Sequence, residues 1–227
     1  TGPLLVTAGA GSGKTRTLTE RVIYLINSHV DPERIVAITF TNKAADEMRK
    51  RITEGVKRTA KKKLPYIGTF HAFCARILRK EAKSLARDHN FAIFDDDDSL
   101  RVVKKIVKSF GLSEDKKASP VLLLKEISNT KMELLTSDAL EFPLKEVFED
   151  YETRLREQNA FDFDDLITKV VELLSTNPSK LKKYQDQFDY VLVDEYQDIN
   201  RAQYVFIKLL SKEHGNLNVV GDDQQSI

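Results

Sequence analysis

Five short runs of apolar and β-branched residues have the length of β-strands. They are LLVT (4–7), IVAITF (35–40), YIGT (66–69), YVLV (190–193) and LNVV (217–220). The runs are nearly continuous rather than alternating, which is typical of parallel strands covered by helices on both faces. The pattern therefore predicts a parallel sheet in an α/β domain.

Helical periodicity follows the first run, where Leu18, Val22, Leu25 and Ile26 have the spacing of an amphipathic helix. Strand, helix and strand then recur across 39–69. This alternation is the pattern of an α/β sheet in which helices connect parallel strands.

Between about residues 75 and 188 the pattern is helical, and no run there predicts a strand. The helical segments are 75–86, 99–111, 121–128, 145–158 and 164–175. We therefore expect a discontinuous sheet domain, 1–80 and 180–227, with an inserted all-helical subdomain over 81–179.

Composition narrows the class of protein. The 36 basic and 35 acidic residues nearly cancel, so any surface for nucleic acid must be local. The single cysteine, Cys74, excludes an intramolecular disulfide and favours a reducing compartment. No apolar run is long enough to span a bilayer. We expect a cytoplasmic protein with no membrane partner. Strands close to both ends of the sequence suggest a fragment of a larger protein.

The segment AGAGSGKT (8–15) follows the first predicted strand and opens a helix, as a phosphate-binding loop does. Its glycines let backbone N–H groups surround phosphate oxygens, and the helix adds its positive N-terminal end. Lys14 would reach the β- and γ-phosphates, and the Thr15 hydroxyl would bind magnesium. The alternative is a glycine-rich turn with a solvated lysine. Ala8 stands where the motif usually has its first glycine.

Two adjacent carboxylates, Asp194 and Glu195, end the run in VLVDEYQD (191–198). Buried charge requires compensation. In phosphate-loop folds an aspartate at a second strand end holds magnesium, which is the role that fits Asp194. Glu195 could then accept a proton from the water that attacks the γ-phosphate. The alternative is that Asp194 caps a helix starting near Tyr196.

Two further polar segments have separate interpretations. GDDQQSI (221–227) offers amide side chains at another strand end, which could bind the γ-phosphate or the attacking water. Taken alone, a loop with turn residues is the better explanation, and the neighbouring motifs give the segment its weight. The acids of FDFDDLI (161–167) and the run Asp95–Asp98 are interpreted as caps of helix N-termini and not as metal ligands.

Together with TFTNKAADEM (39–48) and GTFHAF (68–73), these motifs resemble those of the UvrD/Rep/PcrA group of superfamily 1 DNA helicases. The resemblance extends along nearly the whole chain and includes FAIFDDDD and FDFDDLI in the helical insert. It implies a RecA-like phosphate-loop fold. It also implies an ATP-driven motor that moves 3′ to 5′ on single-stranded DNA and unwinds duplex DNA in replication or repair.

The resemblance implies roles for individual residues. The catalytic residues would be Lys14, Glu195 and the γ-phosphate sensor Gln225, and the metal ligands Thr15 and Asp194. The nucleotide would contact Ala8, Gly9, Ala10, Gly11, Ser12, Gly13, Lys14, Thr15 and Arg16. The DNA strand would contact Phe40, Thr41, Asn42, Thr69, Phe70 and His71. The implied cofactors are ATP and Mg²⁺.

Side-chain chemistry supports part of the DNA assignment. Phe40 could stack on a base, and Asn42, Thr69 and His71 could donate to phosphate oxygens. The alternatives are that Phe40 belongs to the core and that His71 is a packed or capping residue.

The resemblance covers only the first of two RecA-like domains, so the second motor domain of the same parent chain is an expected partner. Adenine recognition and the arginine finger would lie outside this sequence, and this chain alone should be nearly inactive. Two alternatives stay open: the motor part of a helicase–nuclease subunit, and a nucleotide-regulated DNA-binding module without turnover.

Overall fold

The computed structural model describes residues 2–7, 9, 13–56, 63–112 and 118–222, and these form two compact units. The first unit comprises 1–73, 174–199 and 203–227, and the second comprises 74–173 and 200–202.

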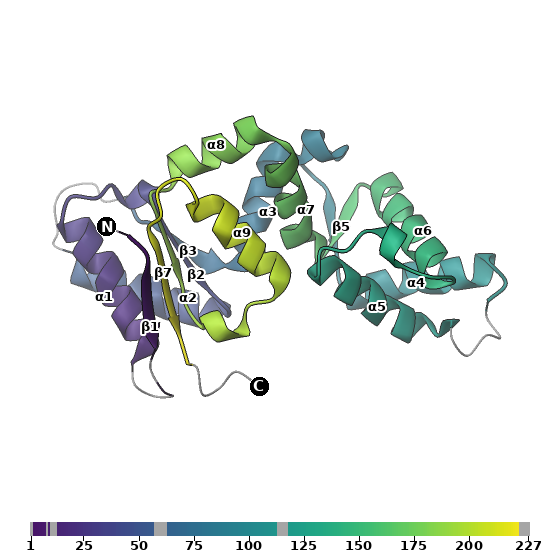
Figure 1. The fold of residues 1–227 in the computed structure, drawn as a ribbon, viewed down its shortest axis with the longest axis horizontal. Coiled ribbons are helices and arrows are strands. Elements are labelled where there is room, and N and C mark those ends of the chain that lie inside the picture. Colours follow the sequence, from purple (N-terminus) through teal and green to yellow (C-terminus); the bar gives the residue numbers. More distant parts are fainter. Residues whose placement is uncertain (1, 8, 10–12, 57–62, 113–117, 223–227) are drawn as a thin grey trace. The chain divides into compact units, whose positions relative to one another are not determined.

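A parallel five-stranded sheet forms the centre of the first unit. Its strands are β1 (Leu4–Thr7), β2 (Ile35–Thr39), β3 (Tyr66–Thr69), β6 (Tyr190–Val193) and β7 (Leu217–Gly221). Their order across the sheet is β1-β7-β6-β2-β3 (Figure 1). Each neighbouring pair is parallel. The predicted parallel sheet and all five strands are confirmed.

The strand order interleaves the two ends of the sequence. β6 and β7, from the C-terminal part of the chain, lie between β1 and β2. Because all the strands are parallel, their carboxyl ends meet at one edge of the sheet. Residues that follow β1, β6 and β7 are therefore neighbours in space, although the sequence separates them widely.

Every residue of β2 is buried, which shows that both faces of this sheet are covered. On one face α1 (Lys14–Asn27) and α2 (Asn42–Gly55) pack their apolar stripes against alternate strand residues, including Ile35 and Ala37 of β2. A separate group of rings packs around Phe73, whose centroid lies 4.6 Å from that of Tyr66, 5.4 Å from Phe188 and 5.9 Å from Phe206.

The apolar periodicity of the sequence does not predict two further helices that follow residue 177. They are α8 (Pro178–Gln187) and α9 (Arg201–Ser211). The mixed polar and apolar composition of α8 hides its pattern, and its start is marked only by the proline at the first helical position.

The second unit contains α4 (Asp96–Ser109), α5 (Pro120–Met132) and α6 (Leu144–Glu157), which pack around a common apolar core. The unit division falls inside three helices: α3 (Phe70–Glu81), α7 (Asp165–Thr176) and the first turn of α9. α3 begins five residues before the predicted segment at Ala75, because the Thr69 hydroxyl accepts a hydrogen bond from the N–H of Ala72 at 3.2 Å.

The expectation that this unit is all-helical is corrected by a small parallel sheet. β4 (Ala92–Phe94) pairs with β5 (Ala160–Asp162), with Ile93 opposite Phe161. Strands of three residues are too short to produce a recognisable period, and these two lie far apart in the sequence. Only tertiary pairing shows that both are extended.

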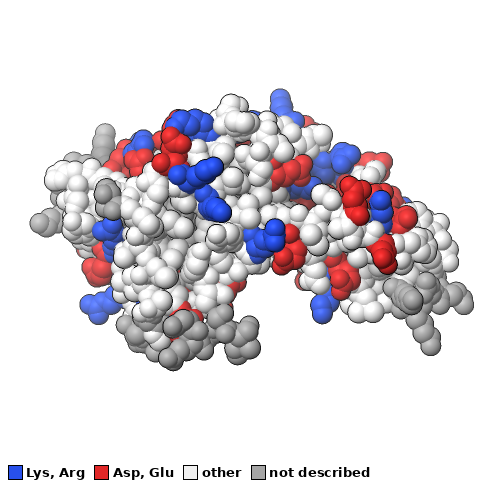
Figure 2. Space-filling view, in the orientation of Figure 1, with Lys and Arg blue, Asp and Glu red and all other residues white. Residues whose placement is uncertain are grey.

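The described residues contain no helix that is long and apolar enough to cross a membrane. On the face drawn in Figure 2, basic and acidic side chains are interspersed. This agrees with the near-zero net charge of the sequence, +1.

Candidate functional site

The carboxyl edge of the first unit's sheet brings together charged residues from three strand ends. Lys14 and Thr15 open α1 after β1, Asp222 follows β7, and Asp194 and Glu195 follow β6. β7 lies between β1 and β6, so Asp222 is placed between the other two groups.

Lys14 is the cation of this cluster. Its side chain is only 8% exposed, and its Nζ lies 3.3 Å from Asp222 Oδ2 and 3.6 Å from Glu195 Oε2. A buried ammonium group requires such compensation. The alternative interpretation of the sequence, a solvated lysine in a glycine-rich turn, does not describe this buried side chain.

Thr15 and Asp194 are joined directly. The Thr15 hydroxyl donates to Asp194 Oδ2 at 2.7 Å, and the Asp194 N–H donates to the Ile38 carbonyl of β2 at 3.0 Å. Asp194 is 2% exposed, and burial, with a smaller contribution from the Glu195 charge, raises the pKa of its carboxyl. The hydrogen bond from Thr15 acts in the opposite direction and favours the charged form.

Glu195 has a left-handed backbone, with φ of 50°. This conformation is uncommon for a residue with a side chain and marks a position that the surrounding structure holds in place. A short 3-10 helix, Tyr196–Asp198, follows it. Asp194 Oδ1 accepts the Glu195 N–H at 3.1 Å, whereas the N-cap position of the 3-10 helix is Glu195, so the alternative in which Asp194 caps a helix near Tyr196 does not describe these contacts.

Two residues of this site were not assigned from the sequence. Asp222 is 2% exposed, and its side chain pairs with Lys14. Gln197 donates from Nε2 to Glu195 Oε2 at 2.9 Å, and its Oε1 accepts the Asp222 N–H at 2.9 Å. Asp222 lay inside a segment already singled out, and its place directly after a strand was the available signal. Gln197 likewise lies inside VLVDEYQD (191–198), but nothing in that motif indicates its contact with Asp222.

Gly13 stands directly before α1, where the sequence predicts the end of a phosphate-binding loop. Gly13 has φ of 88°, a left-handed conformation that favours glycine, and its carbonyl accepts the Thr17 N–H at 2.9 Å. Arg16, in the first turn of α1, is exposed. Four of the predicted loop residues and the predicted phosphate sensor lie outside the described residues, namely Ala8, Ala10, Gly11, Ser12 and Gln225.

The predicted DNA-contacting residues lie at the end of β3 or directly after β2 and β3, two strands that pair with Thr39 opposite Thr69. The same sheet edge therefore places both segments side by side. Thr41 caps α2, because its hydroxyl accepts the Ala44 N–H at 3.1 Å. Asn42, the first residue of that helix, is exposed.

The two phenylalanines in these segments differ in exposure. Phe70 is 1% exposed and belongs to the core, whereas Phe40 is only partly buried. Their rings meet edge to face at 5.9 Å between centroids. Burial lowers the pKa of His71 to about 4, so this side chain is neutral at pH 7 and would bind a phosphate by hydrogen bonding alone.

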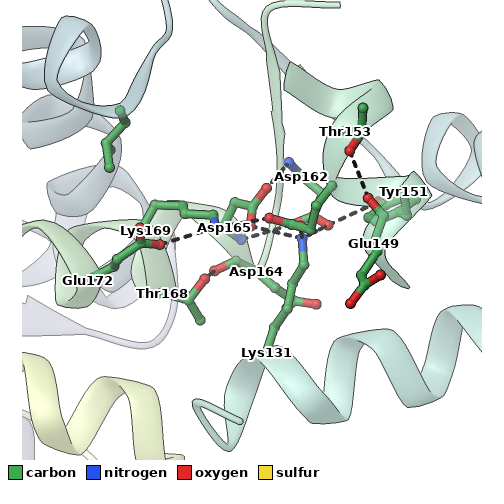
Figure 3. Close-up of polar contacts among 12 residues, drawn as sticks. Lys131, Glu149, Tyr151, Thr153, Asp162, Asp164, Asp165, Thr168, Lys169 and Glu172 are labelled. Carbon is green, nitrogen blue, oxygen red and sulfur yellow. Dashed lines mark hydrogen bonds and ion pairs between the residues drawn. The ribbon is translucent and has the colours of Figure 1, made fainter. Parts of the chain in front are cut away.

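A second polar cluster lies inside the second unit (Figure 3). Lys131 of α5 is buried, and its Nζ lies 2.6 Å from Glu152 Oε1, 2.7 Å from Asp162 Oδ2 and 2.8 Å from Asp165 Oδ1. The Tyr151 hydroxyl donates to Asp162 Oδ2 at 2.9 Å. The three carboxylates are thus compensated by a shared ammonium group.

The same aspartates cap α7. Asp162 Oδ1 accepts the Asp165 N–H at 2.8 Å, and Asp165 Oδ2 accepts the Asp162 N–H at 3.3 Å. This reciprocal pair has the form of a capping box. Asp95 likewise accepts the Asp98 N–H at the start of α4, at 2.8 Å. The hydrogen bonds agree with the capping interpretation of these acids.

Among the described residues, no group of three or more His, Cys, Asp or Glu side chains could hold a metal ion. The Thr15 hydroxyl and the Asp194 carboxylate nevertheless offer two hard oxygen ligands at one point. Such a pair suits magnesium, which usually keeps waters and takes its remaining ligands from substrate phosphates.

The parallel sheet, its strand order and the buried lysine at the start of α1 are those of a RecA-like fold. The model of the UvrD/REP helicase N-terminal domain matches residues 1–227, and the chain belongs to this family. This confirms the resemblance inferred from the sequence motifs.

Its relatives include the ATP-dependent DNA helicase PcrA of Staphylococcus epidermidis and that of Staphylococcus aureus. Each is 43% identical over 235 residues, which cover 100% of this chain and 32% of the relative. The chain therefore spans about a third of the length of the curated relatives that it matches.

Proposed function

We propose that this chain is the ATP-binding part of an ATP-dependent DNA helicase. This proposal rests above all on one observation, the convergence of Lys14, Thr15, Asp194 and Glu195 at one sheet edge. Family membership and the names of the relatives support the same activity.

Bound ATP with magnesium would supply the phosphoanhydride bond and the metal's positive charge. Lys14 would exchange its carboxylate partners for phosphate oxygens, and Thr15 and Asp194 would ligate the metal. Glu195 would accept the proton of the attacking water. We further assign Arg16 and the loop from Ala8 to Gly13 to nucleotide binding, and Gln225 to the terminal phosphate.

We propose that single-stranded DNA binds at the ends of β2 and β3. Phe40 would stack on a base, and Thr41, Asn42, Thr69 and His71 would contact the sugar–phosphate backbone. Phe70 would contribute through the core, since its ring is buried. We further propose that the protein moves 3′ to 5′ on single-stranded DNA and unwinds duplex DNA in replication or repair. Its partner would be a second RecA-like motor domain of the same parent chain, and its location would be cytoplasmic.

Two substitutions test the nucleotide site. Lys14→Ala should abolish binding of magnesium-bound ATP, measured with a fluorescent nucleotide. Glu195→Gln should preserve binding and remove turnover. Lys50→Ala, an exposed lysine of α2, is the control and should change neither. Unchanged affinity in a folded Lys14→Ala protein would refute the assignment.

A further inference from the structure

Gln197 connects two parts of the nucleotide site that come from different strands. It lies in the 3-10 helix after β6, and its amide contacts both Glu195 and the N–H of Asp222 after β7. Its Nε2 also donates to Asp198 Oδ2, at 3.1 Å. The Gln197 side chain therefore forms hydrogen bonds with residues that follow two different strands, β6 and β7.

The chemistry of these partners allows one orientation of the amide. Carboxylates of Glu195 and Asp198 accept hydrogen bonds, so they require the NH₂ group. The Asp222 N–H donates, so it requires the amide oxygen. A carboxylate at position 197 could accept from Asp222 but could not donate to Glu195. An amide is thus the group that serves both directions.

We propose that Gln197 is a positioning residue for ATP hydrolysis, which holds the Glu195 carboxylate in place relative to the end of β7. The inference rests on the proposed function, in which Glu195 is the base. Gln197 itself does not touch the nucleotide in this proposal. It acts on hydrolysis through Glu195.

The surroundings of Glu195 explain why such a support is needed. Its backbone is left-handed, and its side chain is 36% exposed, so few packing contacts restrict the carboxylate. Gln197 and Lys14 both contact the same oxygen, Oε2. We assign the other oxygen, Oε1, to the attacking water. A base whose direction is set in advance loses less freedom when the transition state forms.

The end of β7 is packed closely against Gln197. A Cβ atom placed on Gly221 would lie 3.0 Å from Gln197 Oε1 and 3.4 Å from its backbone nitrogen. Glycine therefore permits the approach that the Asp222 N–H needs to reach the amide. The side chain of the same Asp222 pairs with Lys14.

The test compares ground-state and transition-state binding in the full-length form of the protein, with single-stranded DNA present. Gln197→Leu removes the amide at similar volume, and Gln197→Glu keeps the shape but cannot donate. For both variants we expect the affinity for magnesium-bound ADP to stay within about twofold of wild type. The affinity for ADP with aluminium fluoride should fall about tenfold or more. The single-turnover rate with ATP should fall about 10- to 100-fold.

A second background separates positioning from general loss of structure. In Glu195→Gln, where the base is absent, adding Gln197→Leu should cause no further fall in the residual rate. Gln158→Leu, at the exposed end of α6, is the control and should leave both affinities unchanged. Melting temperatures verify that each variant is folded.

Three outcomes would overturn the inference. The affinities for ADP and for the analogue could fall equally, or neither could fall. The rate could also fall further, by the full factor, when Gln197→Leu is added to Glu195→Gln. Failure of the proposed function itself would give other results. The wild-type protein would then bind ADP with aluminium fluoride no more tightly than ADP, or Lys14→Ala would leave the affinity for magnesium-bound ATP unchanged.

Discussion

The Thr15 hydroxyl donates a 2.7 Å hydrogen bond to Asp194 Oδ2, although 179 positions separate the two residues in the sequence. β1 and β6 are not adjacent in the sheet, because β7 lies between them. Thr15 therefore reaches Asp194 from the first turn of α1, across the end of β7. This contact joins the start of α1 to the acidic residues that follow β6.

Thr15→Ala should reduce the dependence of nucleotide affinity on magnesium. The hydroxyl is one proposed metal ligand and also orients the other, so its loss should weaken metal-dependent binding about 10- to 100-fold. Affinity is measured for ATP with magnesium and with a chelator. Thr15→Ser keeps the hydroxyl and should retain most of the magnesium effect. Equal magnesium dependence in wild type and Thr15→Ala would contradict the metal assignment.

Phe40→Ala should weaken binding of single-stranded DNA. Stacking of one base on an aromatic ring contributes about 1–3 kcal/mol, so the dissociation constant should rise at least about fivefold. Binding is followed by fluorescence anisotropy with oligonucleotides of several sequences and at several salt concentrations, and affinity should fall with salt. Tyr24→Ala, which removes an exposed ring of α1, is the control. Strong sequence preference, or unchanged binding in Phe40→Ala, would count against this surface.

Lys131→Met should destabilise the second unit strongly. The substitution leaves Glu152, Asp162 and Asp165 without the ammonium group that they share, and an uncompensated buried charge costs about 3–5 kcal/mol. Urea unfolding measures the change in free energy. Lys145→Met is the control, because Lys145 pairs with the exposed Asp138 at 3.8 Å, and it should change stability by less than about 1 kcal/mol.

The stability of the second unit should also depend on pH through Asp165. Burial and the neighbouring Asp162 raise the pKa of its carboxyl to about 7, whereas the pKa of an aspartate in an unfolded chain is ~3.9. The folded state therefore binds the proton more tightly. The contribution of Asp165 to the free energy of unfolding is complete below the pKa of the unfolded carboxyl. This contribution is lost as the pH rises through about 7.

The comparison with Asp165→Asn isolates this group from others that titrate in the same window. Among them is His71, whose lowered pKa has the opposite effect. The free energy of unfolding of wild type minus that of Asp165→Asn should fall as pH rises from about 5 to 8, by at most about 1.4 kcal/mol per pH unit. Glu152 should not disturb this window. Burial alone would raise the pKa of its carboxyl, but Lys131 and Lys169 outweigh burial and lower it to about 2. A difference independent of pH would contradict the assignment.

Part of the nucleotide site could be predicted because its chemistry is local in the sequence. Lys14 and Thr15 follow a strand and open a helix, and Asp194 and Glu195 end an apolar run, so each pair carries its own signal. Gln197 and Asp222 lie inside motifs that the sequence marks, but their own roles come from contacts between residues that follow different strands, which no local pattern shows. The difference between Phe40 and Phe70 is of the same kind, since burial depends on the neighbours that packing supplies.

The sequence by itself determined the five strands of the sheet, most of the helices and the class of the site, because apolar periodicity and motif spacing act over a few neighbouring residues. Only the tertiary structure decided the order β1-β7-β6-β2-β3, the pairing of β4 with β5, and the contacts that join Thr15, Asp194, Gln197 and Asp222. These depend on contacts between segments far apart in the chain. Such contacts form when strands pair and bury their faces together, and a local pattern does not encode which distant segment will be the neighbour.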